Sequence, residues 1–214
     1  QAPIKSVTDK HLNKFSHYEY KENVAIALEV AKIAGINKSV ALRGMYKALP
    51  DAGAFRLQKH NISGKKPKTI YWANLFAIND RESFVQTVSA LKIKTGNRTK
   101  RAVILNNRHD RPERVAQFVD IILNSISVDY VITFGDYEKQ VVRLIEKSKN
   151  KNKPKVLHLG NSSDYRSATG EVLWQEITSA ITAKECLLIG AVNVHTKQAH
   201  SLLDVMRVED VVYA

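Results

Sequence analysis

Short apolar runs alternate with longer amphipathic stretches along most of this chain, and this alternation restricts the possible folds more than any other feature. Five runs are typical of buried strands, and they lie at residues 69–76, 102–106, 130–134, 156–159 and 186–189. Between and after them, apolar residues recur at helical spacing. Strands that alternate with helices of this length predict βαβ units. The expected fold class is therefore α/β, a Rossmann-like, mostly parallel sheet with flanking helices.

The apolar faces place the expected helices of this sheet. They lie at 81–91 and 112–124, around 141–145 and 173–181, and at 198–205. A short candidate strand at 55–60 precedes the run at 69–76, and the turn between them contains Gly64 and Pro67. This pair predicts a hairpin at one end of the sheet.

Two helical patterns precede the sheet, at 22–34 and 38–48, and Gly35 is expected to end the first. They have no strand pattern of their own and are too short to form a domain alone. We therefore expect residues 1–54 to be an incomplete part of one domain and residues 55–214 to form the α/β domain. The sequence begins without Met, which we interpret as a fragment or a processed chain.

Five loops follow the expected strands and should share one edge of the sheet, where α/β proteins bind ligands. Turn chemistry explains why these loops contain Gly, Asn, Asp and Ser. It does not explain Arg108, His109 and Arg111 beside Asn106 and Asp110. The sequence therefore predicts a ligand site at this edge, centred on the loop before the helix at 112.

The chain is basic, with 33 Lys and Arg against 21 Asp and Glu, and its net charge of +12 suits an anionic partner. Three lysine-rich stretches, at 64–68, 92–101 and 147–155, each precede a strand and should lie at the edge opposite the predicted site. Two interpretations remain open. The stretches are solvated loops, or they form a docking face for an anionic polymer or acidic lipid headgroups.

Several kinds of site are missing from the sequence. It contains no G-x-x-x-x-G-K-[ST] phosphate loop, no G-x-G-x-x-G and no G-x-S-x-G. The seven histidines are dispersed and Cys186 is the single cysteine, so no metal site is expected. No apolar run approaches the roughly 20 residues that span a bilayer, and a lone cysteine fits a reducing, cytoplasmic setting. This chain alone is expected to lack a complete catalytic site.

Three stretches resemble the Mur ligases, which are ATP-dependent amide-forming enzymes. The first is the Asn-led helix ENVAIAL at 22–28, with ALRGM at 41–45 and LPDAGAFR at 49–56. The second is NLFAIND at 74–80, and the third is the pattern N-x-R-x-D-R-x-x-R at 106–114. With LIGAVNVH at 188–195, these stretches most resemble the capsule-type (CapB/PgsB-type) poly-γ-glutamate synthases.

The sequence departs from the Mur-ligase pattern at four positions. Ile78 and Asp80 stand where many Mur ligases have His and Pro. Ile26 and Leu75 replace residues that contact the nucleotide in some relatives.

The resemblance implies a domain assignment, a reaction and a set of partners. Residues 1–54 would be the C-terminal helical part of the central domain, and 55–214 the C-terminal domain. The reaction would use ATP and Mg²⁺, bound mainly by an N-terminal half that this sequence lacks, to join glutamate to poly-γ-glutamate through an acyl phosphate. The partners would be that N-terminal half, membrane subunits of a capsule synthase and further copies in a homo-oligomer, at the inner face of the membrane.

The resemblance also gives roles to individual residues. Arginine is suited to a substrate carboxylate or γ-phosphate, because its guanidinium donates two parallel hydrogen bonds. The expected substrate-binding residues are Arg108, Arg111, Asp110, Asn79, Asp80 and Asn106, and the expected nucleotide contacts are Asn23 and Arg56. No residue is assigned to catalysis or to a metal.

Local structural roles compete with these assignments. Asp110, Asn79 and Asn23 each stand where a side chain can cap a helix. On the simplest interpretation, Arg114 is an exposed helix residue rather than a ligand contact, and His109 and His195 are surface residues.

Two other functions remain as alternatives to a ligase. One is a nucleic-acid-binding module, which the charge permits, but aromatic residues are only 7% and do not interleave with the basic stretches as stacking platforms would. We therefore expect no nucleic acid partner. The other is a non-catalytic docking domain of a membrane-associated capsule-synthesis complex, attached through the lysine-rich edge.

Overall fold

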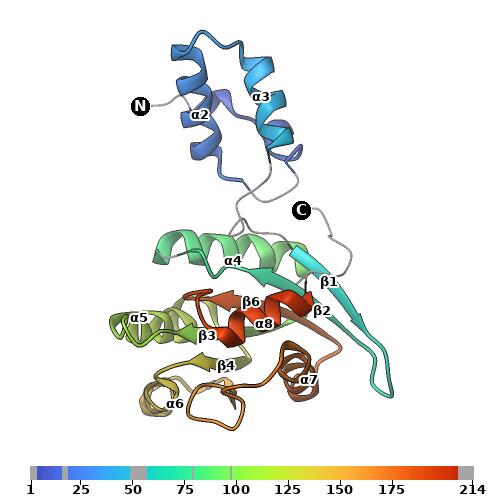
Figure 1. Ribbon diagram of the computed structural model, residues 1–214, viewed down its shortest axis with the longest axis vertical. Coiled ribbons are helices and arrows are strands. Elements are labelled where there is room, and N and C mark those ends of the chain that lie inside the picture. Colours follow the sequence, from blue (N-terminus) through green and yellow to red (C-terminus); the bar gives the residue numbers. More distant parts are fainter. Residues whose placement is uncertain (1–3, 16–18, 49–56, 79, 97, 207–214) are drawn as a thin grey trace. The chain divides into compact units, whose positions relative to one another are not determined.

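The computed structural model describes residues 4–15, 19–48, 57–78, 80–96 and 98–206. At residues 92–94 it describes only the backbone. The chain divides into two compact units, one of residues 1–56 with 212–214 and one of residues 57–211 (Figure 1). We call them the helical unit and the sheet unit and describe each by itself. The expected domain boundary between residues 54 and 55 lies outside the described residues.

The helical unit contains only helices among its described residues. They are the 3₁₀ turn η1 (Ile4–Ser6), α1 (Asp9–Leu12), α2 (Lys21–Ile33) and α3 (Lys38–Lys47). Gly35 follows α2 with a φ of 75°, as expected for a glycine that ends a helix. Asn37 caps α3, because its side-chain oxygen accepts a hydrogen bond from the Ser39 backbone nitrogen at 2.8 Å. The unit's small core consists of Val7, Phe15, Val24, Ala25, Leu28 and Leu42.

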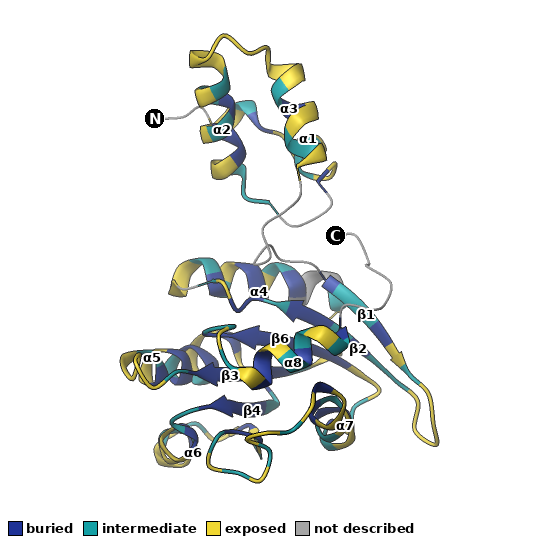
Figure 2. Ribbon diagram, viewed as in Figure 1, coloured by how far each residue is buried: buried dark blue, intermediate teal, exposed yellow. Residues whose placement is uncertain are grey.

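This unit also leaves large apolar side chains in contact with solvent. Ile26, Val30 and Ile33 on α2 are 56%, 61% and 81% exposed. Their spacing of four and three residues places them on one face of the helix, which we call the apolar row. In Figure 2, much of α2 has the colour of exposed residues.

The sheet unit is built on six strands in the order β1-β2-β6-β3-β4-β5. The strands are β1 (Leu57–Ile62), β2 (Lys68–Asn74), β3 (Lys100–Asn107), β4 (Tyr130–Gly135), β5 (Lys155–His158) and β6 (Glu185–Ala191). β1 pairs with β2 in antiparallel fashion, and every other pairing is parallel. The expected α/β class, the mostly parallel sheet and the hairpin at one end are therefore confirmed.

The helices of the sheet unit lie close to their expected positions. They are α4 (Arg81–Thr95), α5 (Glu113–Ile121), α6 (Glu138–Lys147), α7 (Gly170–Ala180) and α8 (Lys197–Met206). The expectation of one continuous α-helix at 112–124 is wrong at its end, since a π-helical turn, η2, occupies Ile122–Ile126. The spacing of apolar residues could not predict the π-helical turn. The turn begins at Ile122, which is the last residue of the apolar face, so it leaves that spacing unchanged.

The direction of the strand connections decides which face each helix covers. Parallel crossovers are almost always right-handed. The connections through α4, α5 and α6 advance across the sheet in one direction, whereas the connection from β5 to β6 through α7 returns. α7 and α8 therefore pack on one face, over a core that includes Ile104, Ile132 and Leu188. α4 and α5 meet on the other face, where the rings of Phe84 and Phe118 pack edge to face with their centroids 5.3 Å apart.

Candidate substrate site at the carboxyl edge of the sheet

The loops after β3 and β6 lie next to each other at the carboxyl edge, because these two strands are neighbours in the sheet. The helix after β3 covers one face and the helix after β6 covers the other. Such a reversal is the topological switch point at which α/β proteins bind ligands. The loop that the sequence singled out, residues 106–111, thus lies at the switch point.

Asn106 joins these two loops. Its side chain is fully buried, its amide nitrogen donates to the Asn193 backbone oxygen, and its amide oxygen accepts from the Thr196 hydroxyl at 2.8 Å. Thr196 also accepts from the Ala199 backbone nitrogen at 3.2 Å, at the start of α8. Both polar ends of Asn106 are thus used inside the protein, which suits a residue that positions the loops.

Arg108 and Asp110 form a two-point ion pair within the same loop. The guanidinium Nε lies 2.9 Å from Asp110 Oδ1 and the Nη2 lies 2.7 Å from Oδ2. The two side chains are 29% and 39% exposed, so the pair lies at the surface of the loop. Loss of solvation raises the pKa of Asp110, but the hydrogen bonds and charge of Arg108, a backbone hydrogen bond and the charge of His109 together outweigh it, so the pKa lies below its ordinary value. Arg108 therefore already holds a carboxylate in the geometry that a bound substrate would use.

The capping alternative for Asp110 is not what the structure shows. The position before α5 is Pro112, and no side chain caps that helix. Asp110 faces Arg108 instead. Arg111 is exposed beside this pair, and Arg114 extends its Nη1 to the Val192 backbone oxygen at 3.5 Å.

The other expected site residues have more varied positions. Asp80 caps α4 by accepting a hydrogen bond from the Ser83 backbone nitrogen at 2.8 Å, and this bond is the main reason that the pKa of Asp80 is lowered. Asp80 follows β2, which β6 separates from β3. Asn23 does not cap α2 but donates its amide to Glu19 Oε1 at 3.0 Å in the helical unit. Asn79 and Arg56 lie outside the described residues.

Two features of the switch point were not identified from the sequence. Asn107, the last residue of β3, is 1% exposed, and both its side-chain polar atoms are buried without a hydrogen-bond partner among the described residues. Val192, just after β6, has a φ of 81°, a rare and strained value for a β-branched residue. Unsatisfied polar atoms and backbone strain are concentrated at functional sites in proteins. The doubled asparagine at the end of an apolar run was the available signal for Asn107.

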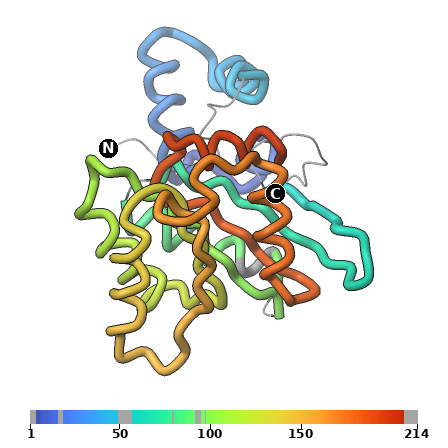
Figure 3. Tube along the Cα trace, turned by 60° about the horizontal axis from the view of Figure 1, so that its bottom comes forward, coloured from blue at the N-terminus to red at the C-terminus, as the bar shows by residue number. Residues whose placement is uncertain are grey.

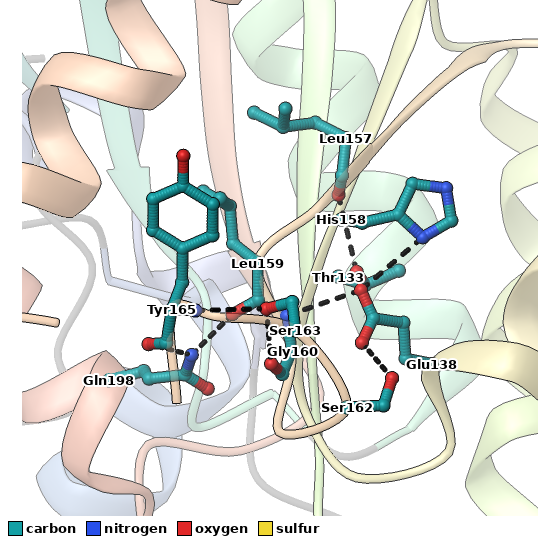
Figure 4. Close-up of polar contacts among 10 residues, drawn as sticks. All are labelled: Thr133, Glu138, Leu157, His158, Leu159, Gly160, Ser162, Ser163, Tyr165 and Gln198. Atoms are coloured by element: carbon teal, nitrogen blue, oxygen red, sulfur yellow. Dashed lines mark hydrogen bonds and ion pairs between the residues drawn. The ribbon is translucent and has the colours of Figure 1, made fainter. Parts of the chain in front are cut away.

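A buried polar network holds the neighbouring strand ends in place (Figure 4). The Gln198 amide oxygen accepts from the Gly135 backbone nitrogen at 2.9 Å, and its nitrogen donates to the Leu159 and Tyr165 backbone oxygens. One residue of α8 thus ties together the carboxyl ends of β4 and β5.

Glu138 anchors the loop after β5 from the other face. Its carboxylate accepts hydrogen bonds from Thr133 at 2.9 Å and from Ser162, and His158 Nδ1 lies 3.3 Å from Oε1. Burial raises the pKa of Glu138, but the hydrogen bonds from Ser162, Thr133 and the Gly160 backbone and the charge of His158 together outweigh it, so the pKa lies below its ordinary value. Gln198 and Glu138 thus fix the carboxyl ends of β4 and β5, and β4 is the direct neighbour of β3, the strand that leads into residues 106–111.

The described residues do not form a magnesium site by themselves. No group of three or more His, Cys, Asp or Glu side chains is placed to hold a metal ion in the described ranges. In the same part of the chain, every helix is too short or too polar to cross a bilayer.

The α/β Rossmann-like fold resembles part of the fold of the Mur ligase MurF. Two crystal structures of MurF from Acinetobacter baumannii superpose with TM-scores of 0.50 and 0.54 over 86% of this chain, and the match covers 36% and 37% of those chains. The sequence identity is 13% in both cases, so this likeness concerns the fold alone.

The sequence comparisons identify one family among the proteins with this fold. The family described as "Poly-gamma-glutamate synthase CapB C-terminal domain" matches residues 59–208. PGA synthase CapB of Bacillus subtilis (strain 168) is 32% identical over 148 residues, which are 69% of this chain and 37% of that protein. Capsule biosynthesis protein CapB of Bacillus anthracis is 30% identical over 141 residues, 66% of this chain and 30% of that protein. The chain therefore belongs to the CapB C-terminal domain family, as its motifs predicted, and spans well under half of these relatives.

Proposed function

We propose that this chain is the C-terminal part of an ATP-dependent ligase that extends poly-γ-glutamate, and that residues 106–111 bind its amino-acid substrate. The family supports the polymer as product, since its description names a poly-gamma-glutamate synthase and the Bacillus subtilis relative is named a PGA synthase. The observation that carries the site is the Arg108–Asp110 pair at the switch point. An amino acid offers a carboxylate and an ammonium, the two charges that this pair contains.

The proposed binding step is an exchange of ion pairs. The substrate carboxylate replaces Asp110 on the Arg108 guanidinium, and the freed Asp110 carboxylate receives the substrate ammonium. Arg111, exposed in the same loop, holds a second carboxylate of glutamate or the γ-phosphate of ATP. Asn106 keeps the loop in register with the one after β6, and Asn79 and Asp80 are the further substrate contacts of this proposal.

The proposed reaction forms one amide bond for each ATP. An oxygen of the polymer carboxylate takes the γ-phosphoryl group of ATP, giving an acyl phosphate and ADP. The substrate nitrogen, after losing a proton, attacks the acyl carbon, and the tetrahedral intermediate expels phosphate. This chain's part is to hold the nucleophile in position, an effect that can supply a large share of the rate. ATP and Mg²⁺ would be bound mainly by the N-terminal half, with Asn23 and Arg56 as nucleotide contacts.

The test is glutamate-dependent ATP hydrolysis after the N-terminal half is supplied in cis or in trans. We expect Arg108→Ala to lower kcat/KM for glutamate at least about 30-fold, because it leaves a charge at the site without its partner. Arg108→Lys should recover little, because an ammonium cannot donate the two parallel bonds. Arg98→Ala, an exposed arginine before β3, is the matched control. Unchanged hydrolysis in both Arg108→Ala and Arg111→Ala would refute the site.

The alternative is a non-catalytic docking domain in a membrane-associated capsule complex. The apolar row on α2 favours some docking role, since large exposed apolar surfaces mark interaction sites. We propose the ligase's own N-terminal half as its partner, with membrane subunits and further copies of the chain as additional partners at the inner face of the membrane. Capture of a membrane subunit that Arg108→Ala and Arg111→Ala do not affect, together with absent ATP hydrolysis, would favour the alternative.

A further inference from the structure

Helix α6 presents a line of cations that the proposed site does not use. Lys139, Arg143 and Lys147 are exposed and spaced by four residues, so they share one face of the helix. Among the described residues, none of the three forms an ion pair, whereas Lys21, Lys32, Arg81 and Lys100 each have an acidic partner within 3.3 Å. We call Lys139, Arg143 and Lys147 the α6 stripe.

The α6 stripe borders a hollow whose lining fits a particular kind of ligand. A hollow of about 590 Å³ is lined by Lys139, Gln140, Arg143, Leu144 and Lys147. It thus offers three cations, one amide and one aliphatic side chain, and no acid. The hollow on the other side of the stripe, about 380 Å³, includes Glu138 and Glu146 and suits an anion less well.

The direction of α6 connects the two edges of the sheet. The helix begins three residues after β4 ends, at the carboxyl edge, and it ends at Lys147, from which the chain leads to the start of β5 at the amino edge. Figure 3 shows α6 continuing directly into the loop at 148–154. That loop adds Lys149 and Lys151, both exposed. The α6 stripe therefore extends from the edge with the candidate site to the lysine-rich edge.

We propose that the α6 stripe is a track that binds poly-γ-glutamate as it leaves the site; this rests on the proposed function and adds a second, polymer-binding surface to it. Each unit of the polymer has a carboxylate, an amide and a pair of methylenes, which match the cations, Gln140 and Leu144. Four helical residues rise about 6 Å. A γ-linked unit adds two backbone bonds to the three of an ordinary residue, which extends its repeat from about 3.6 Å to about 6 Å. Successive carboxylates can therefore meet successive cations.

A linear polymer fits the surface better than a membrane or a nucleic acid does. Helices that lie on membranes expose large apolar side chains beside their cations, and α6 has no exposed large apolar residue. Single-stranded nucleic acids need aromatic platforms for their bases, and the hollow beside the α6 stripe is lined by no aromatic side chain.

Binding of labelled γ-linked glutamate oligomers to the whole chain, followed by fluorescence anisotropy, tests the track. The triple variant Lys139→Glu, Arg143→Glu, Lys147→Glu should weaken binding at least about tenfold, because three attractions become repulsions. The control is Lys5→Glu, Lys10→Glu, Lys47→Glu, which changes the net charge equally at three exposed lysines outside the lysine-rich stretches. We expect the control to stay within about threefold of the wild type, and an equal loss in both variants would overturn the track.

Further arms of the experiment separate the track from other polyanion sites. Glu146→Gln, which removes the exposed acid on α6, should tighten binding. An α-linked polyglutamate of equal charge should bind several-fold more weakly, and equal affinity would overturn recognition of the γ-linked repeat. Stripe-dependent binding to anionic vesicles or to single-stranded DNA, without binding to the polymer, would overturn the proposal in favour of those partners.

The reconstituted ligase distinguishes failure of the track from failure of the proposed function. The α6 stripe variant should still hydrolyse ATP with glutamate but should release shorter polymers. Normal product length together with normal polymer affinity would refute the track alone. A wild-type ligase without glutamate-dependent hydrolysis would refute the proposed function, while the binding measurements would still report on the α6 stripe.

Discussion

The two units of this chain bury their apolar side chains to very different degrees. In the sheet unit, β3, β4 and β6 are almost entirely buried, and Val172 is the one exposed large apolar side chain among the unit's described residues. The helical unit has a core of six side chains and exposes Ile26, Val30 and Ile33, together with Ile36 and Val40. The sheet unit is thus complete as a folding unit, whereas the helical unit has the surface of a part that packs on something else.

The substitution with the largest expected effect tests whether the sheet unit unfolds as a single cooperative unit. Phe118 is fully buried and packs on Phe84, so Phe118→Ala should lower the free energy of unfolding by about 3–5 kcal/mol. Both tryptophans, Trp72 and Trp174, lie in this unit, so tryptophan fluorescence during urea denaturation reports on it alone. Phe15→Ala in the helical unit is the control and should leave the tryptophan transition in place, and a shift of that transition by Phe15→Ala would show that the two units unfold together.

The next effect tests the close contact between two strand ends. Gly135 has a φ of 66°, and a Cβ atom there would lie 2.1 Å from the Asn107 backbone oxygen. Gly135→Ala should therefore cost about 2–3 kcal/mol, from left-handed strain and forced separation of β3 and β4. Gly44→Ala in α3, where a Cβ atom meets nothing within 4 Å, should be neutral or slightly stabilising. Equal stability of wild type and Gly135→Ala would show that the ends of β3 and β4 are packed less closely than in this structure.

A smaller effect depends on pH. Asp80→Ala removes the cap of α4 and should cost about 1 kcal/mol at neutral pH. Because the pKa of Asp80 is lower in the folded state, its contribution is complete above the unfolded pKa of about 3.9 and is lost as the pH falls through the folded value. Wild type and Asp80→Ala should therefore converge in acid. Asp80→Asn should retain the cap without this pH dependence, and a constant difference at all pH values would refute the assignment.

The smallest effect concerns the apolar row. Val30→Ser should change the helical unit's stability by less than about 0.5 kcal/mol, because the side chain is 61% exposed. Leu28→Ala, two residues away but buried, should melt the unit at a clearly lower temperature. Thermal melts followed by circular dichroism at helix wavelengths would measure both. A large loss from Val30→Ser would mean that the row is already packed in this chain.

Much of the fold followed from the sequence because strands buried on both faces appear as continuous apolar runs. The runs at 102–106 and 186–189 are clear for this reason, and their alternation with helices was enough to predict a parallel sheet. The position of β6 between β2 and β3 was not predicted, since strand order depends on contacts between residues far apart in the sequence.

The same limit applies to the candidate site. Residues 106–111 were found from their composition, because turn chemistry does not call for arginine beside asparagine. A role for Asp110 in orienting an arginine was one of the expectations, and the structure shows that the arginine is Arg108. The link from Asn106 to Thr196 and the strain at Val192 were not found. Both depend on three-dimensional geometry, since they arise where the loop after β6 meets the loop after β3.

The short outer strand β5 has a consequence for the molecule's behaviour in concentrated solution. Unpaired strand edges are the places where proteins add foreign strands and aggregate. β5 contains four residues, begins with the exposed Lys155 and follows Pro154, which has no backbone donor. β5 therefore offers a poor template for the addition of a strand from another molecule. The lysines near β5 help to keep a sheet of very apolar strands in solution.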